Sequence, residues 1–255
     1  MGPLFSAIRF LTILPLPSGQ QETDQDWGRA TAWYPAVGLV IGVLLAALDW
    51  ALRWLWPDAV ATALVLAARV ALTGALHLDG FIDCCDALLA PVPPQRRLQI
   101  LRDVHAGAFG IVGVVILLLT KYAALAAAPA ELRLPSLILI PTLARWAMVG
   151  AVWLFPYARS GTGLGQKART GSGLKPLLTA AATAFVVAVL CWWGGLGWGA
   201  PILVLLTVVL SALVGIWIQS RLGGLTGDAY GALCELVEAA CLLTVAAVLF
   251  GGLLP

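Results

Sequence analysis

Long apolar runs recur along the chain and are separated by short polar segments. Six of them cover residues 32–50, 59–78, 106–128, 134–155, 176–193 and 200–218, and a seventh runs from about residue 231 to residue 254. A membrane-crossing α-helix needs about 20 apolar residues. An open sheet cannot satisfy its backbone hydrogen bonds in lipid, and the runs lack the alternation of barrel strands. The pattern therefore predicts an all-α, polytopic membrane bundle of about seven transmembrane helices.

Composition supports this prediction. The 255 residues are 61% hydrophobic and 11% charged, whereas a soluble domain carries about 25% charged residues. The net charge of +2 does not favour nucleic-acid binding. The five cysteines show no spaced framework and are interpreted as small apolar packing residues. We expect one integral membrane domain over residues 1–255, with an interfacial segment at 1–31 and the bundle at 32–255.

Charge is distributed unevenly between the loops. If the spans alternate in direction, one side holds ten basic residues: Arg9, Arg29, Arg96, Arg97, Arg102, Arg159, Lys167, Arg169, Lys175 and Arg221. The other side holds Arg53 and Arg133 together with six tryptophans: Trp50, Trp54, Trp56, Trp192, Trp193 and Trp198. Cytoplasmic loops are enriched in Lys and Arg, and Trp gathers at the membrane interface. The long loops are therefore expected to be cytoplasmic active-site loops.

The main candidate for chemistry is an acidic motif at the end of the second run. Asp79, Asp83 and Asp86 are spaced i, i+4 and i+7, which places them on one face of a helix. Three carboxylates on one face repel one another unless a cation lies between them. Oxygen ligands favour Mg²⁺, Mn²⁺ or Ca²⁺ over Zn²⁺. The alternative is a solvated acidic helix end just outside the membrane.

A second motif precedes the third run. Gly107 and Gly110 permit close backbone approach where a helix begins, and a helix N-terminus favours anions. Asp103 is placed to extend the metal site. The alternative role for the glycines is helix packing.

A third, glycine-rich motif precedes the last run. Its loop carries Thr226 and Asp228, which suit a phosphate or a second cation. Glu235 and Glu238 lie one to two turns inside the following helix, and carboxylates within a membrane are functional candidates. The alternative is that the two glutamates pair with buried Arg69 or Arg145.

Two further features are less specific. The basic loop over residues 157–167 suits either a lid over an anionic substrate or contact with lipid headgroups. His77 and His105 are the two histidines, and each flanks an acidic motif. Together, an acidic metal-binding face, glycine-rich loops and basic loops on one side of a bundle indicate phosphoryl transfer at the membrane surface.

Several stretches then resemble one known family. Residues 77–88 resemble the signature of the cobalamin synthase family, the adenosylcobinamide-GDP ribazoletransferases. Residues 10–17, 34–42, 107–110, 161–165 and 224–228, with Glu235, also match, and all occur in the family's order. The resemblance implies a bacterial inner-membrane enzyme of late vitamin B12 assembly that requires Mg²⁺. It would join adenosylcobinamide-GDP to α-ribazole, or its 5′-phosphate, to give adenosylcobalamin, or its 5′-phosphate, and GMP.

The resemblance also implies site residues. Asp79, Asp83 and Asp86 would hold Mg²⁺, and the expected catalytic residues are Asp83, Asp86, Asp228 and Glu235. The expected substrate-binding residues are His77, Arg102, His105, Gly107, Gly110, Gly224, Thr226, Gly227 and Glu238. The chain departs from the family pattern at residues 84–85, at Ala87 and at residues 103–106, where the family's arginine is missing and His105 is the candidate to replace it in part.

Two other classes place acidic residues in membrane proteins. A CDP-alcohol phosphotransferase requires an Ala-Arg pair soon after its first two aspartates. In this chain Gly80 directly follows the first aspartate, Asp79, and the acidic motif contains no Ala-Arg pair. A cation-coupled transporter would place its carboxylates near the bilayer midplane in broken helices. The expected partners are the corrinoid nucleotide, α-ribazole and the lipid bilayer. Other cobalamin-assembly enzymes and further copies of the chain are compatible partners.

Overall fold

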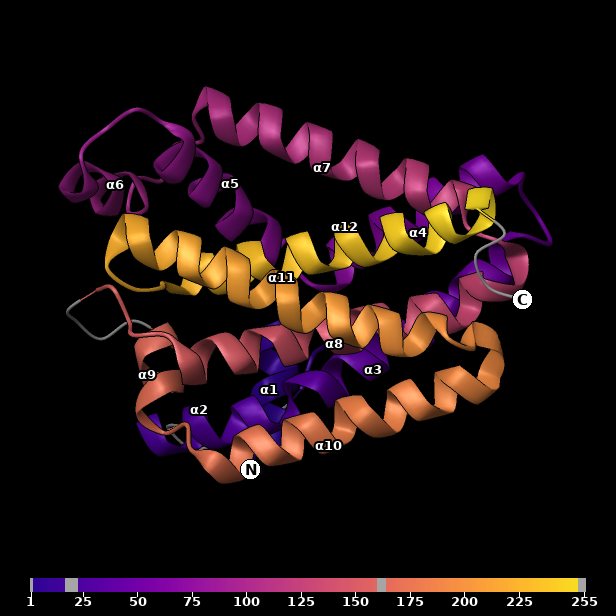
Figure 1. The fold of residues 1–255 in the computed structure, drawn as a ribbon, viewed down its shortest axis with the longest axis horizontal. Helices are drawn as coiled ribbons and strands as arrows, with labels where there is room; N and C mark the ends of the chain where they lie inside the picture. Colours follow the sequence, from indigo (N-terminus) through magenta and orange to yellow (C-terminus); the bar gives the residue numbers. More distant parts are fainter. Residues whose placement is uncertain (1, 17–22, 160–163, 252–255) are drawn as a thin grey trace.

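The computed structural model describes residues 2–16, 23–159 and 164–251, and Figure 1 shows their arrangement. Within this part of the chain the regular structure is helical, apart from an isolated bridge between Tyr157 and Leu225. The helices are α1 (Pro3–Leu11), α2 (Asp24–Ala30), η1 (Thr31–Trp33), α3 (Tyr34–Leu52), α4 (Asp58–Leu72), α5 (Leu76–Leu89), α6 (Pro94–Ile100), α7 (Ala108–Ala127), α8 (Ala130–Leu154), α9 (Leu164–Thr170), α10 (Leu174–Cys191), η2 (Trp192–Leu196), α11 (Gly199–Leu222) and α12 (Gly227–Gly251). The all-α prediction is confirmed. Parts of the predicted 161–165 motif and of the last run, at residues 161–163 and 252–254, lie outside the described residues.

Among the residues that the structure describes, six helices are long and apolar enough to cross a membrane, and a bent pair raises the number to seven. The six are Gln25–Leu52, Ala108–Ala127, Ala130–Leu154, Leu174–Leu196, Gly199–Leu222 and Gly227–Ala247. The number agrees with the prediction of about seven spans.

The predicted second span, residues 59–78, is wrong as one continuous helix. The chain leaves α4 at Leu72 and enters α5 at Leu76 with a bend of 89°. Gly74 and Ala75 have φ angles of 59° and 57°, in the left-handed region, which a right-handed helix cannot contain. An apolar run does not reveal such a break, because apolar composition continues through both helices.

Two helices form the centre of the bundle. In α8 and α12, 72% of the residues in the apolar membrane-spanning stretch are buried inside the protein, against 28% in α7 and 22% in α11. Helix α3 packs closely on α8, because Gly38 and Gly42 face its backbone: a Cβ on Gly42 would lie 2.7 Å from the Leu137 carbonyl oxygen. This small-residue spacing is typical of helix pairs in membranes.

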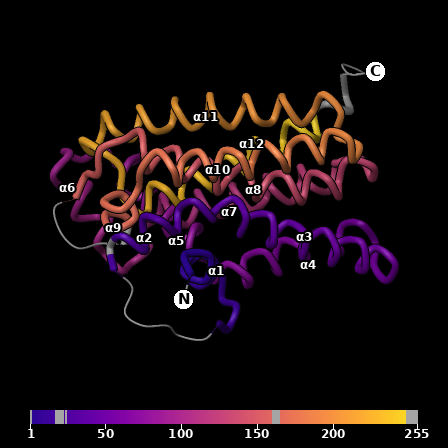
Figure 2. Tube along the Cα trace, turned by 90° about the horizontal axis from the view of Figure 1, so that it is seen from below, coloured from indigo at the N-terminus to yellow at the C-terminus, as the bar shows by residue number. Residues whose placement is uncertain are grey.

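The bundle has two different ends, visible in the ribbon of Figure 1 and in the tube of Figure 2. Helices α2, α5, α6 and α9 gather at one end, and the α3–α4 and α10–α11 turns lie at the other. The six tryptophans of the predicted aromatic belt lie in these turns or in the helix ends beside them, and all are exposed. The polar loops at the first end and the tryptophans at the second match the two-sided pattern of the sequence.

Candidate functional site

The sharp bend before α5 turns the acidic motif across the end of the bundle. Asp79, Asp83 and Asp86 all lie in α5, so the predicted helical spacing is confirmed. Asp79 is exposed, and the other two are partly buried. Gly80 faces α12, where an added Cβ would lie 2.7 Å from the Asp228 carbonyl oxygen. Close packing at Gly80 therefore brings the acidic face of α5 against the start of α12.

Asp86 is bound to the start of α7. Its Oδ2 accepts a hydrogen bond of 2.7 Å from the Gly107 N–H, and its Oδ1 accepts one of 2.9 Å from the Gly110 N–H. A Cβ on Gly107 would come within 2.5 Å of the same carboxylate. The first turn of a helix leaves N–H groups without internal partners, and a carboxylate from the chain itself satisfies two of them here. Gly107 and Gly110 thus form an anion site that holds Asp86.

Asp228 lies in the first turn of α12 and pairs with Arg159. Arg159 Nη2 donates to Asp228 Oδ2 at 2.7 Å and to the Leu101 carbonyl at 2.8 Å. Thr226 Oγ1 donates to the same Oδ2 at 3.3 Å and accepts from the Ala229 N–H, so it caps the helix. The Oδ1 atom of Asp228 receives no hydrogen bond from the described residues.

The Arg159 loop is attached to the loop before α12. Ala158 N–H donates to the Leu225 carbonyl, and Leu225 N–H donates to the Pro156 carbonyl, both at 2.8 Å. Gly224 fits beside this pairing, because a Cβ there would lie 2.5 Å from the Pro156 oxygen. Gly224 and Thr226 are buried and shape the loop, whereas Gly227 lines the cavity described next.

A cavity of about 250 Å³ lies between these elements. Its polar wall contains His77, Asp79, Arg159 and Asp228, and its other walls include Phe10, Tyr34, Met148, Val152, Tyr157 and Tyr230. Burial raises the pKa of Tyr157 above its ordinary value, so its hydroxyl keeps its proton at neutral pH. The cavity can therefore hold a small molecule with an apolar ring and polar groups.

The carboxylates do not form a ready metal cage. Asp83 lies close enough to Asp79 and Asp228 for the negative charges to repel. Among the described residues, however, no three His, Cys, Asp or Glu side chains come together as a metal site. The expected grouping of Asp79, Asp83 and Asp86 around one ion is absent there, because Asp86 is directed at α7.

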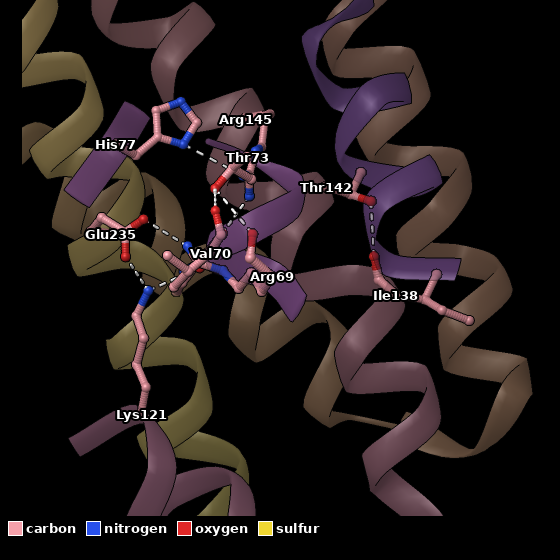
Figure 3. A network of polar contacts seen from close by, with 10 residues as sticks. Arg69, Val70, Thr73, His77, Lys121, Ile138, Thr142, Arg145 and Glu235 are labelled. Atoms are coloured by element: carbon pink, nitrogen blue, oxygen red, sulfur yellow. Dashed lines mark hydrogen bonds and ion pairs between the residues drawn. The ribbon is translucent and has the colours of Figure 1, made fainter. Parts of the chain in front are cut away.

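Glu235 and Glu238 are buried and do not line the cavity. Figure 3 shows Glu235 in a network of polar contacts within the bundle. Lys121 Nζ binds Glu235 at 2.5 Å and Glu238 at 2.9 Å, and Arg69 binds Glu235 at 2.7 Å. Arg145 and Arg69 also pair with Glu238. The expected polar wall of Asp228 with Glu235 or Glu238 is not formed, and the alternative of pairing with Arg69 and Arg145 is what the structure shows.

Three predicted residues lie on the loop after α6 and do not line the cavity. Arg102, Asp103 and His105 are exposed. Hydrogen bonds from the His105 side chain and N–H lower the pKa of Asp103. The cavity also contains Tyr230 and the inward-turned Arg159, to which the sequence motifs assign no role in the site. Phe10 and Tyr34, also on the cavity, lie in the motifs at residues 10–17 and 34–42, which by themselves assign them no role.

Comparison with known proteins now identifies the family. A family model described as cobalamin-5-phosphate synthase matches residues 3–246. The chain belongs to the cobalamin-5-phosphate synthase family. This membership makes the chain a transferase of cobalamin biosynthesis and decides against the two alternative classes.

Relatives in the cobalamin-5-phosphate synthase family support the assignment along nearly the whole chain. The chain is 37% identical to the adenosylcobinamide-GDP ribazoletransferase of Roseiflexus sp., over 96% of this chain and 89% of the relative. It is 37% identical to that of Geotalea daltonii, over 96% of each. For that of Pseudomonas savastanoi pv. phaseolicola the identity is 40%, over 96% of this chain and 99% of the relative. No solved structure matches the chain.

Proposed function

We propose that this chain joins adenosylcobinamide-GDP to α-ribazole, or to its 5′-phosphate, and releases GMP. The product is adenosylcobalamin or its 5′-phosphate. The names of its relatives support these substrates. The observation that carries the proposal is the meeting of Asp79, Asp228 and Arg159 on one cavity, at the end of the bundle that carries the basic loops.

The reaction replaces the phosphoanhydride bond of a diphosphate with a new phosphate ester bond. A ribazole hydroxyl oxygen attacks the phosphorus attached to cobinamide and forms a new P–O bond. The bond from that phosphorus to the bridging oxygen breaks, and GMP leaves with the electron pair. Such a transfer depends on positioning and charge stabilisation more than on covalent chemistry by the protein.

Residues on the cavity are assigned to accept the proton and to position the substrate. We assign the proton of the attacking hydroxyl to Asp228 Oδ1, because Arg159 and Thr226 both donate to Oδ2, Oδ1 receives no hydrogen bond from the described residues, and Asp228 lines the cavity. Arg159 fixes the carboxylate and places a positive charge beside it. His77 and Gly227 line the same space.

Mg²⁺ fits the face formed by Asp79 and Asp83. No donor among the described residues binds either carboxylate, so their oxygens are available to a ligand. Mg²⁺ is commonly held by one or two carboxylates together with substrate phosphates, so a full protein cage is not needed. When bound, the ion would neutralise charge on the diphosphate.

We place the enzyme in the bacterial cytoplasmic membrane with this end of the bundle facing the cytoplasm. The bias of ten basic residues against two supports that orientation. The six exposed tryptophans at the opposite end also support it. A cytoplasmic site would have direct access to nucleotide substrates.

The test is a Mg²⁺-dependent assay in membranes that contain the full chain. Adenosylcobinamide-GDP and α-ribazole are supplied, and GMP release is followed. We expect Asp83→Asn to lower turnover by at least about 100-fold, since metal positioning carries much of such a reaction. Asp58→Asn is the control, because Asp58 lies at the opposite end of the bundle and pairs with Arg53. No GMP release by the wild type, or full turnover by Asp83→Asn, contradicts the proposal.

A further inference from the structure

Two buried polar atoms lining the cavity have no partner. His77 and Tyr230 are 2% and 3% exposed, and both line the cavity beside Asp79 and Asp228. Among the described residues, neither His77 Nε2 nor the Tyr230 hydroxyl oxygen makes a hydrogen bond. A buried polar group without a partner costs about 1–3 kcal/mol, so native structures rarely leave one without a role.

The other nitrogen of His77 is held by the buried network. Arg145 Nη2 lies 3.5 Å from His77 Nδ1, and Arg145 in turn pairs with Glu238. Figure 3 shows the His77 ring at the edge of this network, with Nδ1 directed to Arg145. A guanidinium has no acceptor atom. A hydrogen bond between these two atoms therefore requires Nδ1 to accept, and we infer that the proton of the ring lies on Nε2.

We propose that His77 and Tyr230 form a hydroxyl-binding subsite for the ribose of the nucleoside substrate. His77 Nε2–H donates a hydrogen bond to a ribose oxygen. The Tyr230 hydroxyl forms a second hydrogen bond, as donor or acceptor, with a hydroxyl of the same sugar. Arg145 and Glu238 act as positioning residues, because they set the tautomer of His77 without touching the substrate. The subsite deepens the proposed function and rests on it for the identity of the ligand.

Charge selects a sugar over a phosphate at this place. Of the charged groups on the cavity, Arg159 is paired with Asp228 and Asp79 carries a further negative charge, while His77 and Tyr230 are neutral hydrogen-bonding groups. The positive charge of Arg145 is already paired with Glu238. Phe10 and Tyr34, stacked with ring centroids 6.0 Å apart, lie on the same cavity and suit the apolar base of a nucleoside.

The tautomer can be measured without any substrate. The chain has only two histidines, so ¹⁵N-histidine labelling of the detergent-solubilised full chain gives two sets of ring signals. His105→Gln assigns them, since His105 is exposed and outside the cavity. We expect His77 to carry its proton on Nε2. A proton on Nδ1, or on both nitrogens, overturns the inference whether or not the proposed reaction is correct.

The subsite is tested by binding α-ribazole and its 2′-deoxy and 5′-deoxy forms to the same protein. We expect one deoxy form to bind about tenfold more weakly, as for one lost hydrogen bond. Tyr230→Phe should abolish that difference, and His77→Gln, which keeps an N–H near the Nε2 position, should bind better than His77→Leu. Tyr122→Phe is the control, because Tyr122 lies on α7 and does not line the cavity.

Two outcomes overturn the subsite. Either both deoxy forms bind as tightly as α-ribazole, or Tyr230→Phe keeps the discrimination; in each case water satisfies these groups instead of a sugar. Failure of the proposed function is distinct, because there the wild type releases no GMP and binds no α-ribazole.

Discussion

The carboxylate of Asp86 accepts a 2.7 Å hydrogen bond from the N–H of Gly107, 21 residues further along the chain. This contact joins the end of α5 to the start of α7 across the α6 segment. It also explains why a side chain is excluded at Gly107, where a Cβ would meet the carboxylate. Asp86, which was predicted from the sequence to bind a metal, therefore accepts hydrogen bonds from the backbone of α7.

Replacing Asp86 should lower stability. We expect Asp86→Ala to cost about 1–2 kcal/mol, as for loss of a helix cap, because two N–H groups of α7 lose their acceptor. Asp86→Asn should cost less, because its amide oxygen still accepts one bond. The measurement is thermal unfolding of the detergent-solubilised protein. Asp83→Asn is the matched control, since no described donor binds Asp83 and removing its charge relieves repulsion from Asp79 and Asp228, so its melting temperature should not fall. An unchanged melting temperature for Asp86→Ala would refute the capping role.

A methyl group at Gly80 should separate α5 from α12. The added Cβ of Gly80→Ala would lie 2.7 Å from the Asp228 carbonyl oxygen and 2.9 Å from its Cα, so the backbones must move apart. We expect a loss of about 1–3 kcal/mol, typical of overpacking, and a fall in GMP release because Asp79 and Asp228 no longer face one another correctly.

The control for Gly80 is Gly150 in α8. A Cβ at Gly150 would meet nothing within 4 Å, and alanine is the better helix former by about 1 kcal/mol. Gly150→Ala should therefore be neutral or stabilising. Equal unfolding temperatures for the two variants would show that the α5–α12 approach does not need a glycine.

Lys121 should be essential to the interior of the bundle. It is fully buried and pairs with both Glu235 and Glu238. Lys121→Met removes a positive charge that pairs with the buried carboxylates of Glu235 and Glu238. Removing one partner of a buried ion pair costs about 3–5 kcal/mol of folding stability. Adding Glu235→Gln should recover part of this loss, because it removes one of the unbalanced charges.

An exposed ion pair gives the comparison for Lys121. Arg53 and Asp58 are joined at 3.0 Å, but their side chains are 27% and 62% exposed. Arg53→Met should cost no more than about 1 kcal/mol. Similar unfolding temperatures for Lys121→Met and Arg53→Met would contradict the role of the buried network.

The orientation can be tested by labelling single cysteines from each side of sealed vesicles. The five native cysteines are free and buried, so their background reaction with an impermeant maleimide should be low. Arg102→Cys, at the site end, should react from the cytoplasmic side. Trp54→Cys, at the tryptophan end, should react from the opposite side, and labelling of both from one side would refute the topology.

Helical spans, their number and the acidic face could be predicted from the sequence, because each depends on local patterning. Apolar runs of suitable length require helices in lipid. The spacing of Asp79, Asp83 and Asp86 places them on one face of whatever helix contains them. The basic and tryptophan-bearing loops likewise separate the two ends of the bundle before any contact is known.

Only the tertiary structure decided what each charged group meets. Lys121 and Glu235 lie 114 residues apart, and Arg69 and Glu235 lie 166 apart, so no local pattern pairs them. The positive φ angles at Gly74 and Ala75 break an apolar run that reads as continuous. The acidic face of α5 was therefore determined by sequence periodicity, whereas the binding of Asp86 to α7 and the opening of Asp79 to the cavity follow from helix packing, which depends on shape and contact between distant segments.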